Sequence, residues 1–414
     1  MSLLAANRSY RLLFSATAIS NLGDGVSALA FPWLATLITR DPMLIAAIAF
    51  ATRLPWLLFA IPAGVIVDRA DRRVLMVRAD LVRLGLTALV IALVISAPSF
   101  PLPGSELPYV AALGALAFLL GTAEVIRDNA AQTVLPSIIP KPDLERANGQ
   151  LWSVEQIMGS FVGPPLAGVL IALAVPAPFV LDAISFGLAA LLVWAIALPR
   201  RKAPPPRRMR VEMAEGWRWM RAHPMVLRLA IMLGIINALS TMGLTILILV
   251  SQEVFRLDAV GHGILLTAGA AGGVVGGLAG PWVIARIGGQ RAVMLALALF
   301  PLPMLVIGLT HSPWIAGAAL FLEMIAALLW NIVTVSWRQR LIPDELLGRV
   351  NSLYRFFGWG MMPVGALAAG WVVGLAEPGL GRETALRLPY LLGAGGAGLL
   401  AFYGWAQLRL TQPT

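Results

Sequence analysis

Apolar stretches about as long as a bilayer is thick recur along the whole of this sequence. Of its 414 residues, 59% are hydrophobic and 13% are charged, and most charges stand in short segments between the apolar stretches. A helix of about 20 apolar residues crosses the hydrocarbon core of a membrane. Because backbone polar groups in lipid must be hydrogen-bonded within the helix, the chain is expected to be an all-α, multi-pass membrane protein.

The apolar stretches predict twelve transmembrane helices with mostly short connections. Six fall in the first half, at 12–38, 44–67, 74–96, 108–128, 149–174 and 178–198. Six fall in the second half, at 226–250, 262–285, 291–309, 313–335, 350–375 and 387–408. We therefore expect one six-helix bundle over 1–198 and another over 225–414.

The segment 199–224, PRRKAPPPRRMRVEMAEGWRWMRAHP, joins the two halves and is rich in Arg and Pro. It is expected to hold a short amphipathic helix around 212–221 that lies on anionic lipid headgroups. Nucleic acid is the other partner that a basic, Trp-containing segment suggests, but the Lys and Arg of the whole chain gather on the linker side of the predicted spans. The opposite side holds only Arg40, Arg256, Arg382 and Arg387. The net charge of +10 therefore indicates topology, with the linker and both termini cytoplasmic, and no nucleic-acid partner.

The two halves are similar in sequence. The segments IPKPDLERANGQL (139–151) and IPDELLGRVNSLY (342–354) both follow the fourth span of their half, and Arg146 of one matches Arg349 of the other. Two glycine-containing segments follow in the fifth spans, GPPLAG at 163–168 and GALAAG at 365–370. Repeated halves are typical of secondary transporters, so we expect the two bundles to be pseudo-symmetric.

Five charges crowd into the connection between the second and third spans, in the sequence GVIVDRADRR (64–73). Arginines at the end of a span set its orientation, but acidic residues contribute little to that rule. Acids beside arginines therefore indicate ion pairs that form in one conformation and break in another, and we interpret this segment as a cytoplasmic gate. Its residues are Gly64, Asp68, Arg69, Asp71, Arg72 and Arg73.

The same segment resembles the signature of the major facilitator superfamily, G-x-L-a-D-R-x-G-R-R/K, which joins the second and third helices of that fold. Five positions match it and two depart from it, since Ile66 replaces the Leu and Asp71 replaces the second Gly. The resemblance extends over the whole chain through the twelve spans, the linker and the repeat. It implies the major facilitator fold and transport by rocking of two six-helix bundles about a central site.

A second segment, GSFVGPPLAG in the fifth span, resembles the antiporter signature of this superfamily through Gly159, Gly163, Pro164 and Gly168. That resemblance implies proton-linked export. The alternative for the same residues is ordinary close packing of small residues with a proline bend. Four further stretches, SNLGDGVSALAFPWL, RLPWLLFAIPAG, LERANG and EGWRWMRAHP, are similar to the branch of bacterial drug–proton antiporters that contains macrolide-efflux proteins and the enterobactin exporter.

Ionisable side chains at membrane depth are costly and mark candidate functional sites. Asp24 and Arg53 count to similar depths in the first two spans, so we expect a buried pair, or a pair that opens when a proton binds Asp24. An unpaired carboxyl at this depth would be protonated at rest, and an amide there bonds either a substrate or a neighbouring helix. The remaining candidates for proton coupling or substrate contact are Glu155, Glu323, Asn237 and Asn331.

A second cluster of charges, Glu124, Arg127 and Asp128, ends the fourth span. We interpret it as an interfacial network that braces the gate segment, together with Arg146 and Arg349 of the repeated segments.

The leading hypothesis is a secondary transporter that exports an amphiphilic small molecule, such as a drug, siderophore or lipid-like compound, in exchange for protons. The few intramembrane charges favour this over a symporter or uniporter that imports a small polar solute. An integral membrane enzyme is a distant alternative, because the chain has no cysteine and no HExxH motif, and its histidines lie in loops or at span ends.

No ATP-binding motif, cofactor or metal site is indicated, so a gradient must supply the energy. From the Ala-, Leu- and Arg-rich composition we expect a bacterial protein of the inner membrane. We also expect it to be a monomer in that bilayer.

Overall fold

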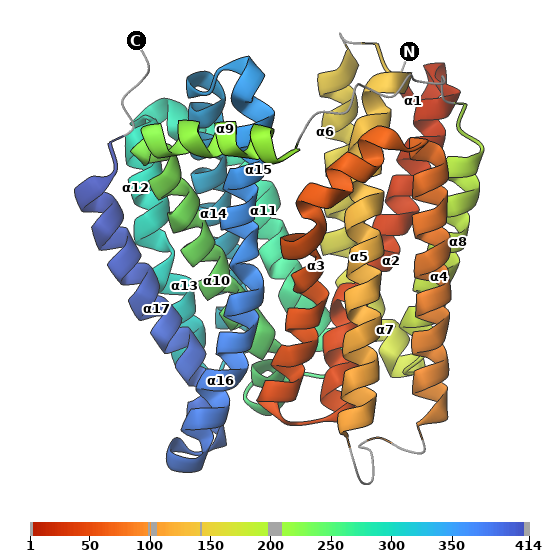
Figure 1. The fold of residues 1–414 in the computed structure, drawn as a ribbon. Helices are drawn as coiled ribbons and strands as arrows, with labels where there is room; N and C mark the ends of the chain where they lie inside the picture. Colours follow the sequence, from red (N-terminus) through yellow and green to blue (C-terminus); the bar gives the residue numbers. More distant parts are fainter. Residues whose placement is uncertain (1–2, 98–99, 101–105, 141–142, 198–208, 410–414) are drawn as a thin grey trace. The chain divides into compact units, whose positions relative to one another are not determined.

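The computed structural model describes residues 3–97, 100, 106–140, 143–197 and 209–409, and all of their regular secondary structure is helical (Figure 1). In this part of the chain, 11 helical segments are long and apolar enough to cross a membrane. The first predicted span corresponds to α2 (Arg8–Ile38), which has 31 residues but is not one of the 11. Asn21 and Asp24 near its centre lower its apolar character, so the number twelve stays a prediction.

The chain divides into two compact units. The first unit consists of Met1–Arg40, Ala51–Pro205 and Asp258–Thr267, and the second consists of Asp41–Phe50, Pro206–Leu257 and Ala268–Thr414. Each unit therefore includes the first residues of one helix whose remainder belongs to the other unit. These two helices are α3 (Pro42–Arg69) and α11 (Ala259–Ile287).

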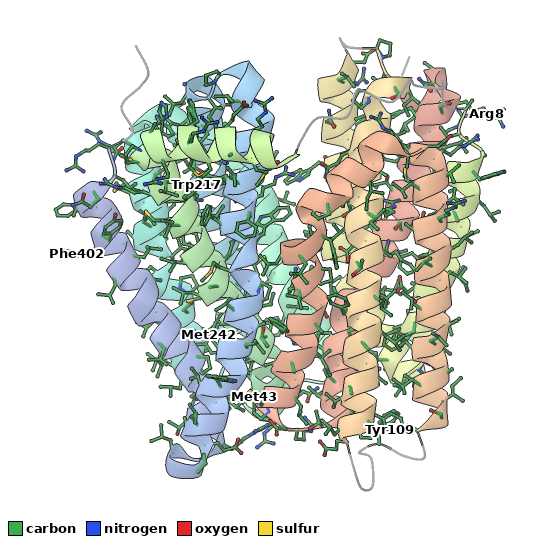
Figure 2. The ribbon with its side chains drawn as sticks, in the orientation of Figure 1. Arg8, Met43, Tyr109, Trp217, Met242 and Phe402 are labelled. Carbon is green, nitrogen blue, oxygen red and sulfur yellow. The ribbon has the colours of Figure 1, made fainter. Side chains whose placement is uncertain are left out.

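In the first unit, α8 packs against both α2 and α4, and α5 packs on α4 (Figure 1). Arg8 and Tyr109 lie at opposite ends of this unit, because α2 and α5 begin at opposite ends (Figure 2). The Tyr10 hydroxyl donates to Gln150 Oε1 at 2.9 Å and thereby ties α2 to α6. Besides α2 and α3, the helices are α1 (Leu3–Ala6), α4 (Arg72–Ser96), α5 (Leu107–Ile138), α6 (Leu144–Glu155), α7 (Gly163–Leu173) and α8 (Ala177–Trp194).

A π-helical segment, η2 (Gln156–Val162), joins α6 to α7 within the fifth predicted span. Pro164 and Pro165 follow it, and neither can donate the backbone hydrogen bond that an α-helix requires. A π turn lets a helix pass such a break without ending. The antiporter-like motif thus lies where the helix widens, from η2 into α7.

In the second unit, α10 packs on α16 and α17, and its core includes Leu229, Trp330 and Tyr354. Besides α11, the helices are α9 (Met209–Ala222), α10 (Pro224–Glu253), α12 (Gly289–Leu299), α13 (Pro301–Leu309), α14 (Pro313–Leu341), α15 (Asp344–Gly360), α16 (Met362–Leu380) and α17 (Arg382–Gln407).

The linker helix is α9, which lies across one end of the second unit (Figure 1). Trp217, labelled in Figure 2, stacks on Phe357 of α15 with ring centres 5.9 Å apart. Glu215 of α9 forms an ion pair with Arg349 of α15. The linker helix is therefore attached to α15 by an aromatic contact and an ion pair.

Candidate functional site in the first unit

Asp24, in the middle of α2, forms an ion pair with Arg83 of α4. Only 4% of the Arg83 side chain is exposed, against 32% of the Asp24 side chain. The Arg83 guanidinium also lies 3.5 Å from Ser20 Oγ and 3.9 Å from the centre of the Phe186 ring. A carboxylate and an aromatic face thus compensate the charge of a guanidinium that is buried in an apolar bundle.

Asp80, one turn before Arg83 on α4, extends this pair into a network. Its side chain is fully buried, and its Oδ1 lies 3.5 Å from Nε of Arg127 and 3.9 Å from Nη1 of Arg83. Arg127, on α5, lies 3.8 Å from Oδ1 of Asp128. Alternating charges therefore run from Asp24 through Arg83, Asp80 and Arg127 to Asp128.

Arg53 does not pair with Asp24, so that expectation was wrong. Arg53 is exposed on α3 and interacts electrostatically with Glu124 of α5, which also interacts with Asp24 and Arg83. Counting residues gave a similar depth for Arg53 and Asp24, but depth does not fix the rotation of a helix about its axis. Glu124 and Arg127 therefore adjoin the ion pairs around Arg83, and their bracing of the gate segment stays a prediction.

Two more carboxyl groups adjoin the network. Asp182 of α8 is 1% exposed, and its Oδ2 accepts a hydrogen bond of 2.6 Å from Ser27 of α2. Glu155, the last residue of α6, interacts electrostatically with Asp128. Among the described residues, no group of three or more His, Asp or Glu side chains is arranged to hold a metal ion.

The glycines of the antiporter-like motif allow η2 and α7 to approach α2 closely. A Cβ on Gly25 would lie 2.7 Å from Cα of Gly159, and a Cβ on Gly163 would lie 2.6 Å from Cα of Gly25. Because no side chain fits between these backbones, η2 and α7 pack directly against the turn of α2 that carries Asp24. These glycines therefore provide the close helix packing that was the alternative to an antiporter role. The same packing also positions the turn of α2 that carries Asp24.

The repeated segment of the second half packs in the same way. Gly365 of α16 lies against Ala238 of α10, where a Cβ on the glycine would be 2.7 Å from the Ala238 carbonyl carbon. In sequence, Gly365 corresponds to Gly163, and α10 corresponds to α2 as the first span of its half. The fifth span of each half therefore packs on the first span of that half.

The last glycine of each repeat makes a second matching contact. A Cβ on Gly168 of α7 would lie 2.7 Å from Cα of Val260 at the start of α11. A Cβ on Gly370 of α16 would lie 2.9 Å from Cα of Met43 at the start of α3. These contacts explain why each compact unit includes the first residues of a helix that continues in the other.

The described residues of the gate segment have local structural roles. Oδ1 of Asp71 accepts hydrogen bonds from the backbone N–H groups of Arg73 at 3.0 Å and Val74 at 3.2 Å, which makes Asp71 the N-cap of α4. Arg73 donates to the carbonyl oxygen of Ile196 at 3.2 Å. A helix cap thus accounts for the acid that departs from the superfamily signature. The side chains of Asp68 and Arg69, and the surroundings of Gly64, are not among the described parts of the structure.

The other arginines expected at the gate have described contacts of their own. Arg72 lies 3.4 Å from Ser137 Oγ, Arg146 is exposed, and Arg349 is held by Glu215 of α9. None of these contacts joins the Glu124, Arg127 and Asp128 cluster. The gate itself stays a prediction.

The second unit holds the remaining candidates. Glu323 of α14 accepts a hydrogen bond of 2.8 Å from Ser240 of α10 and forms no ion pair with any described residue. Asn237 donates to the carbonyl oxygen of Gly358 at 2.9 Å, which is the interhelical bonding expected as one of its two roles. Asn331 is exposed on α14.

The sequence analysis missed Asp80 and Arg83, which are central to the network. Both lie in the segment RADLVRLG, near the start of the third span. There they resemble the charged residues that commonly flank a membrane span. Their depth was the available signal, because at 1.5 Å per residue they lie about 12 and 16 Å inside α4. A depth count along every span would have found them, although not their partners.

Membrane-length helices that enclose ion pairs around a buried guanidinium are typical of a multi-pass membrane transporter. The chain belongs to the transmembrane secretion effector family of the major facilitator superfamily, whose pattern it matches over residues 4–398. It is therefore a transporter and not an enzyme, as the sequence had indicated.

Three relatives span most of the chain at low identity. The multidrug efflux pump Tap of Mycobacterium tuberculosis is 27% identical over 384 residues, which cover 87% of this chain and 85% of Tap. Macrolide efflux protein A of Streptococcus pyogenes is 24% identical, with 86% and 87% covered. The enterobactin exporter EntS of Salmonella typhimurium is 24% identical, with 86% and 83% covered.

Solved structures share the fold at still lower identity. A bacterial homologue of the iron transporter ferroportin superposes with a TM-score of 0.76 at 17% identity and covers 99% of this chain and 100% of its own. The nucleoside transporter NupG superposes with a TM-score of 0.67 at 13% identity, with 99% and 100% covered. The major facilitator fold is therefore shown by structure as well as by sequence.

Proposed function

We propose that this chain is a secondary transporter that exports an amphiphilic small molecule in exchange for protons. The buried ion pair between Asp24 and Arg83 is the observation on which the proposal rests. The Asp24 carboxylate has a cationic partner and a side chain that is 32% exposed, and a proton that binds it would break the pair with Arg83.

The charges of the network favour a bound proton. At least four carboxyl groups interact with three guanidinium groups, so the network carries an excess negative charge when all of its members are ionised. Uncompensated charge in a low-dielectric interior is costly, and binding one proton removes it. The members are Asp24, Asp80, Glu124, Asp128, Arg53, Arg83 and Arg127.

The relatives support the direction and the class of substrate. Tap, macrolide efflux protein A and the enterobactin exporter are each named for moving a compound out of the cell, and the three names cover different compounds. In the second unit the intramembrane candidate Glu323 is hydrogen-bonded to a neutral Ser240, which suits a cavity for a largely apolar substrate.

The arrangement in the membrane follows the sequence. We propose twelve spans, with α2 as the first, in two bundles over 1–198 and 225–414 that act by alternating access. The linker end, with both termini and α9, faces the cytoplasm of a bacterial cell, and the chain acts as a monomer in the inner membrane. The gate at 64–73 is part of the same proposal.

Proton flux in liposomes tests this function. Purified protein is reconstituted with a pH-sensitive dye inside, and a gradient of a macrolide, a cationic dye or a catecholate siderophore is imposed. Proton movement driven by one of these compounds, and lost in Asp24→Asn, is the expected result. Glu106→Gln is the matched control, because Glu106 is a carboxyl of the same unit whose side chain makes no cap hydrogen bond to α5.

Other outcomes favour other carriers. Movement of a compound without protons would identify a uniporter. Movement of protons and a small polar solute in the same direction would identify a symporter, the alternative that the sequence left open. Either result overturns proton-coupled export, although the family assignment would stand.

A further inference from the structure

Asp80 is a fully buried carboxylate whose oxygens are not satisfied. None of its side chain is exposed, and neither Oδ1 nor Oδ2 accepts a hydrogen bond of ordinary geometry from the protein. The nearest donors are Arg127 at 3.5 Å and Arg83 at 3.9 Å. A buried carboxylate in this state is destabilising, since unmade bonds to a charged group cost more than those to a neutral one.

Arg83 lies between this carboxylate and that of Asp24. One nitrogen of its guanidinium, Nη2, is in contact with Asp24, while Nη1 faces Asp80 at 3.9 Å. A hydrogen bond of this type is about 2.9 Å long, so a shift of roughly 1 Å would join Arg83 to Asp80. A change in side-chain rotation supplies that shift without moving α4.

We propose that Asp80 is the alternate partner of Arg83 and receives its guanidinium whenever a proton neutralises Asp24. The proton comes from water and adds to the Asp24 carboxylate, and no other bond is made or broken. When the proton leaves, Arg83 returns to Asp24. This inference rests on the proposed proton coupling, and it makes Asp80 a positioning residue that touches neither substrate nor solvent.

Exposure separates the roles of the two carboxylates. About a third of the Asp24 side chain is exposed and none of the Asp80 side chain, so we assign proton binding to Asp24 and the alternate contact to Asp80. Arg83 keeps a carboxylate partner in both states. The other charged groups that face this site are Arg53 from α3, Glu124, Arg127 and Asp128 from α5, and Asp182 from α8.

A double-mutant cycle on thermal unfolding tests the exchange without transport. Asp24→Asn imitates the protonated state, so Arg83 then depends on Asp80. Asp80→Asn should therefore lower the Tm by about 3 °C or more beyond its effect in the wild-type background. Equal losses in the two backgrounds would show that Asp80 serves Arg127 alone and would overturn the proposal.

Two further variants keep the cycle decisive. Asp71→Ala is the control, because Asp71 caps the same helix through the backbone N–H groups of Arg73 and Val74, 12 residues before Arg83, and its effect should be nearly the same in the wild-type and Asp24→Asn backgrounds. Asp80→Glu keeps the charge, so in the Asp24→Asn background its Tm should lie well above that of Asp80→Asn. If the double variant with Asp80→Asn is too unstable to purify, the one with Asp80→Glu should still be purified and show a measurable Tm. Equal loss from Asp80→Glu and Asp80→Asn would overturn the proposal.

Transport then separates this inference from the proposed function. If the wild-type protein shows no proton flux with any compound, proton coupling fails, whereas the unfolding cycle still reports whether Arg83 changes partner. If the wild type is coupled, Asp80→Asn should need about a tenfold higher proton concentration for half-maximal exchange, because Arg83 then has only Asp24 to bind. An unchanged pH dependence in that variant would overturn the exchange.

Discussion

The two units share a packing device but differ in how they accommodate charge. Gly163 in the first and Gly365 in the second bring the fifth span of each half against the first span. Yet the first unit buries a network of ion pairs around Arg83, whereas the intramembrane carboxyl Glu323 of the second is bonded to the Ser240 hydroxyl. The packing contact is present in both halves. The first unit has ion pairs around a buried guanidinium, whereas ion pairs described in the second, such as Arg382 with Glu253, lie at helix ends.

Under the proposed function, this difference predicts separate tasks for the two units. Ion pairs inside a membrane are stable only while each charge has its partner, so a network of them responds to a single proton. A carboxyl that meets a hydroxyl has no such dependence. We therefore expect the first unit to respond to protons and the second to offer a largely neutral surface.

The largest expected effect comes from removing Arg83. Arg83→Met leaves Asp24 and Asp80 without their shared cation, and breaking a buried pair in this way costs about 3–5 kcal/mol. The free energy of unfolding of purified protein measures it.

A buried arginine of the second unit is the control. Arg338 is 7% exposed, donates to Asn351 Oδ1 at 3.3 Å and lies 3.3 Å from the centre of the Tyr354 ring, with no carboxylate in contact among the described residues. Arg338→Met should therefore cost less, about 2 kcal/mol, since no anion is stranded. Equal costs at the two sites would contradict the contrast between the units.

Matched glycine substitutions should show the similarity of the units. Gly163→Ala and Gly365→Ala each place a methyl group against a backbone that is already in contact, which costs about 2 kcal/mol through displaced helices. Gly374→Ala on α16 meets nothing within 4 Å and should be neutral or slightly stabilising. Thermal unfolding of the three variants measures this. A large effect at one repeat position only would mean that the packing is not equivalent.

The cap of α4 gives a smaller effect. Asp71→Ala removes the acceptor for two backbone N–H groups and should cost about 1 kcal/mol, and Asp71→Ser should restore most of it. The corresponding helix of the second half, α12, has Gly288 as its N-cap, with φ of 83° and no side chain to cap with. If Asp71→Ser regains stability but not transport, Asp71 acts in the gate as well as in the cap.

Much of this architecture could be predicted from the sequence, because apolar length and spaced glycines act locally. The 11 membrane-length segments fall where apolar runs were found, and the glycines of 163–168 and 365–370 do pack helices closely. The partner of Asp24 could not be predicted. Arg53 and Arg83 both lie deep in their spans, and only the packing of α4 against α2 and α8 decides that Arg83 is the one in contact.

Glu323 should give the smallest change in stability. In Glu323→Gln the amide oxygen can still accept the hydrogen bond from Ser240, so a change below about 0.5 kcal/mol is expected if the group is neutral in the resting protein. Ser240→Ala, which removes the donor, should cost about 1 kcal/mol. A loss of about 2 kcal/mol or more in Glu323→Gln would instead show an ionised carboxylate with a cationic partner, and the contrast between the units would fail. Preserved stability with lost transport of a cationic compound, but not of a neutral one, would make Glu323 the residue that selects substrates by charge.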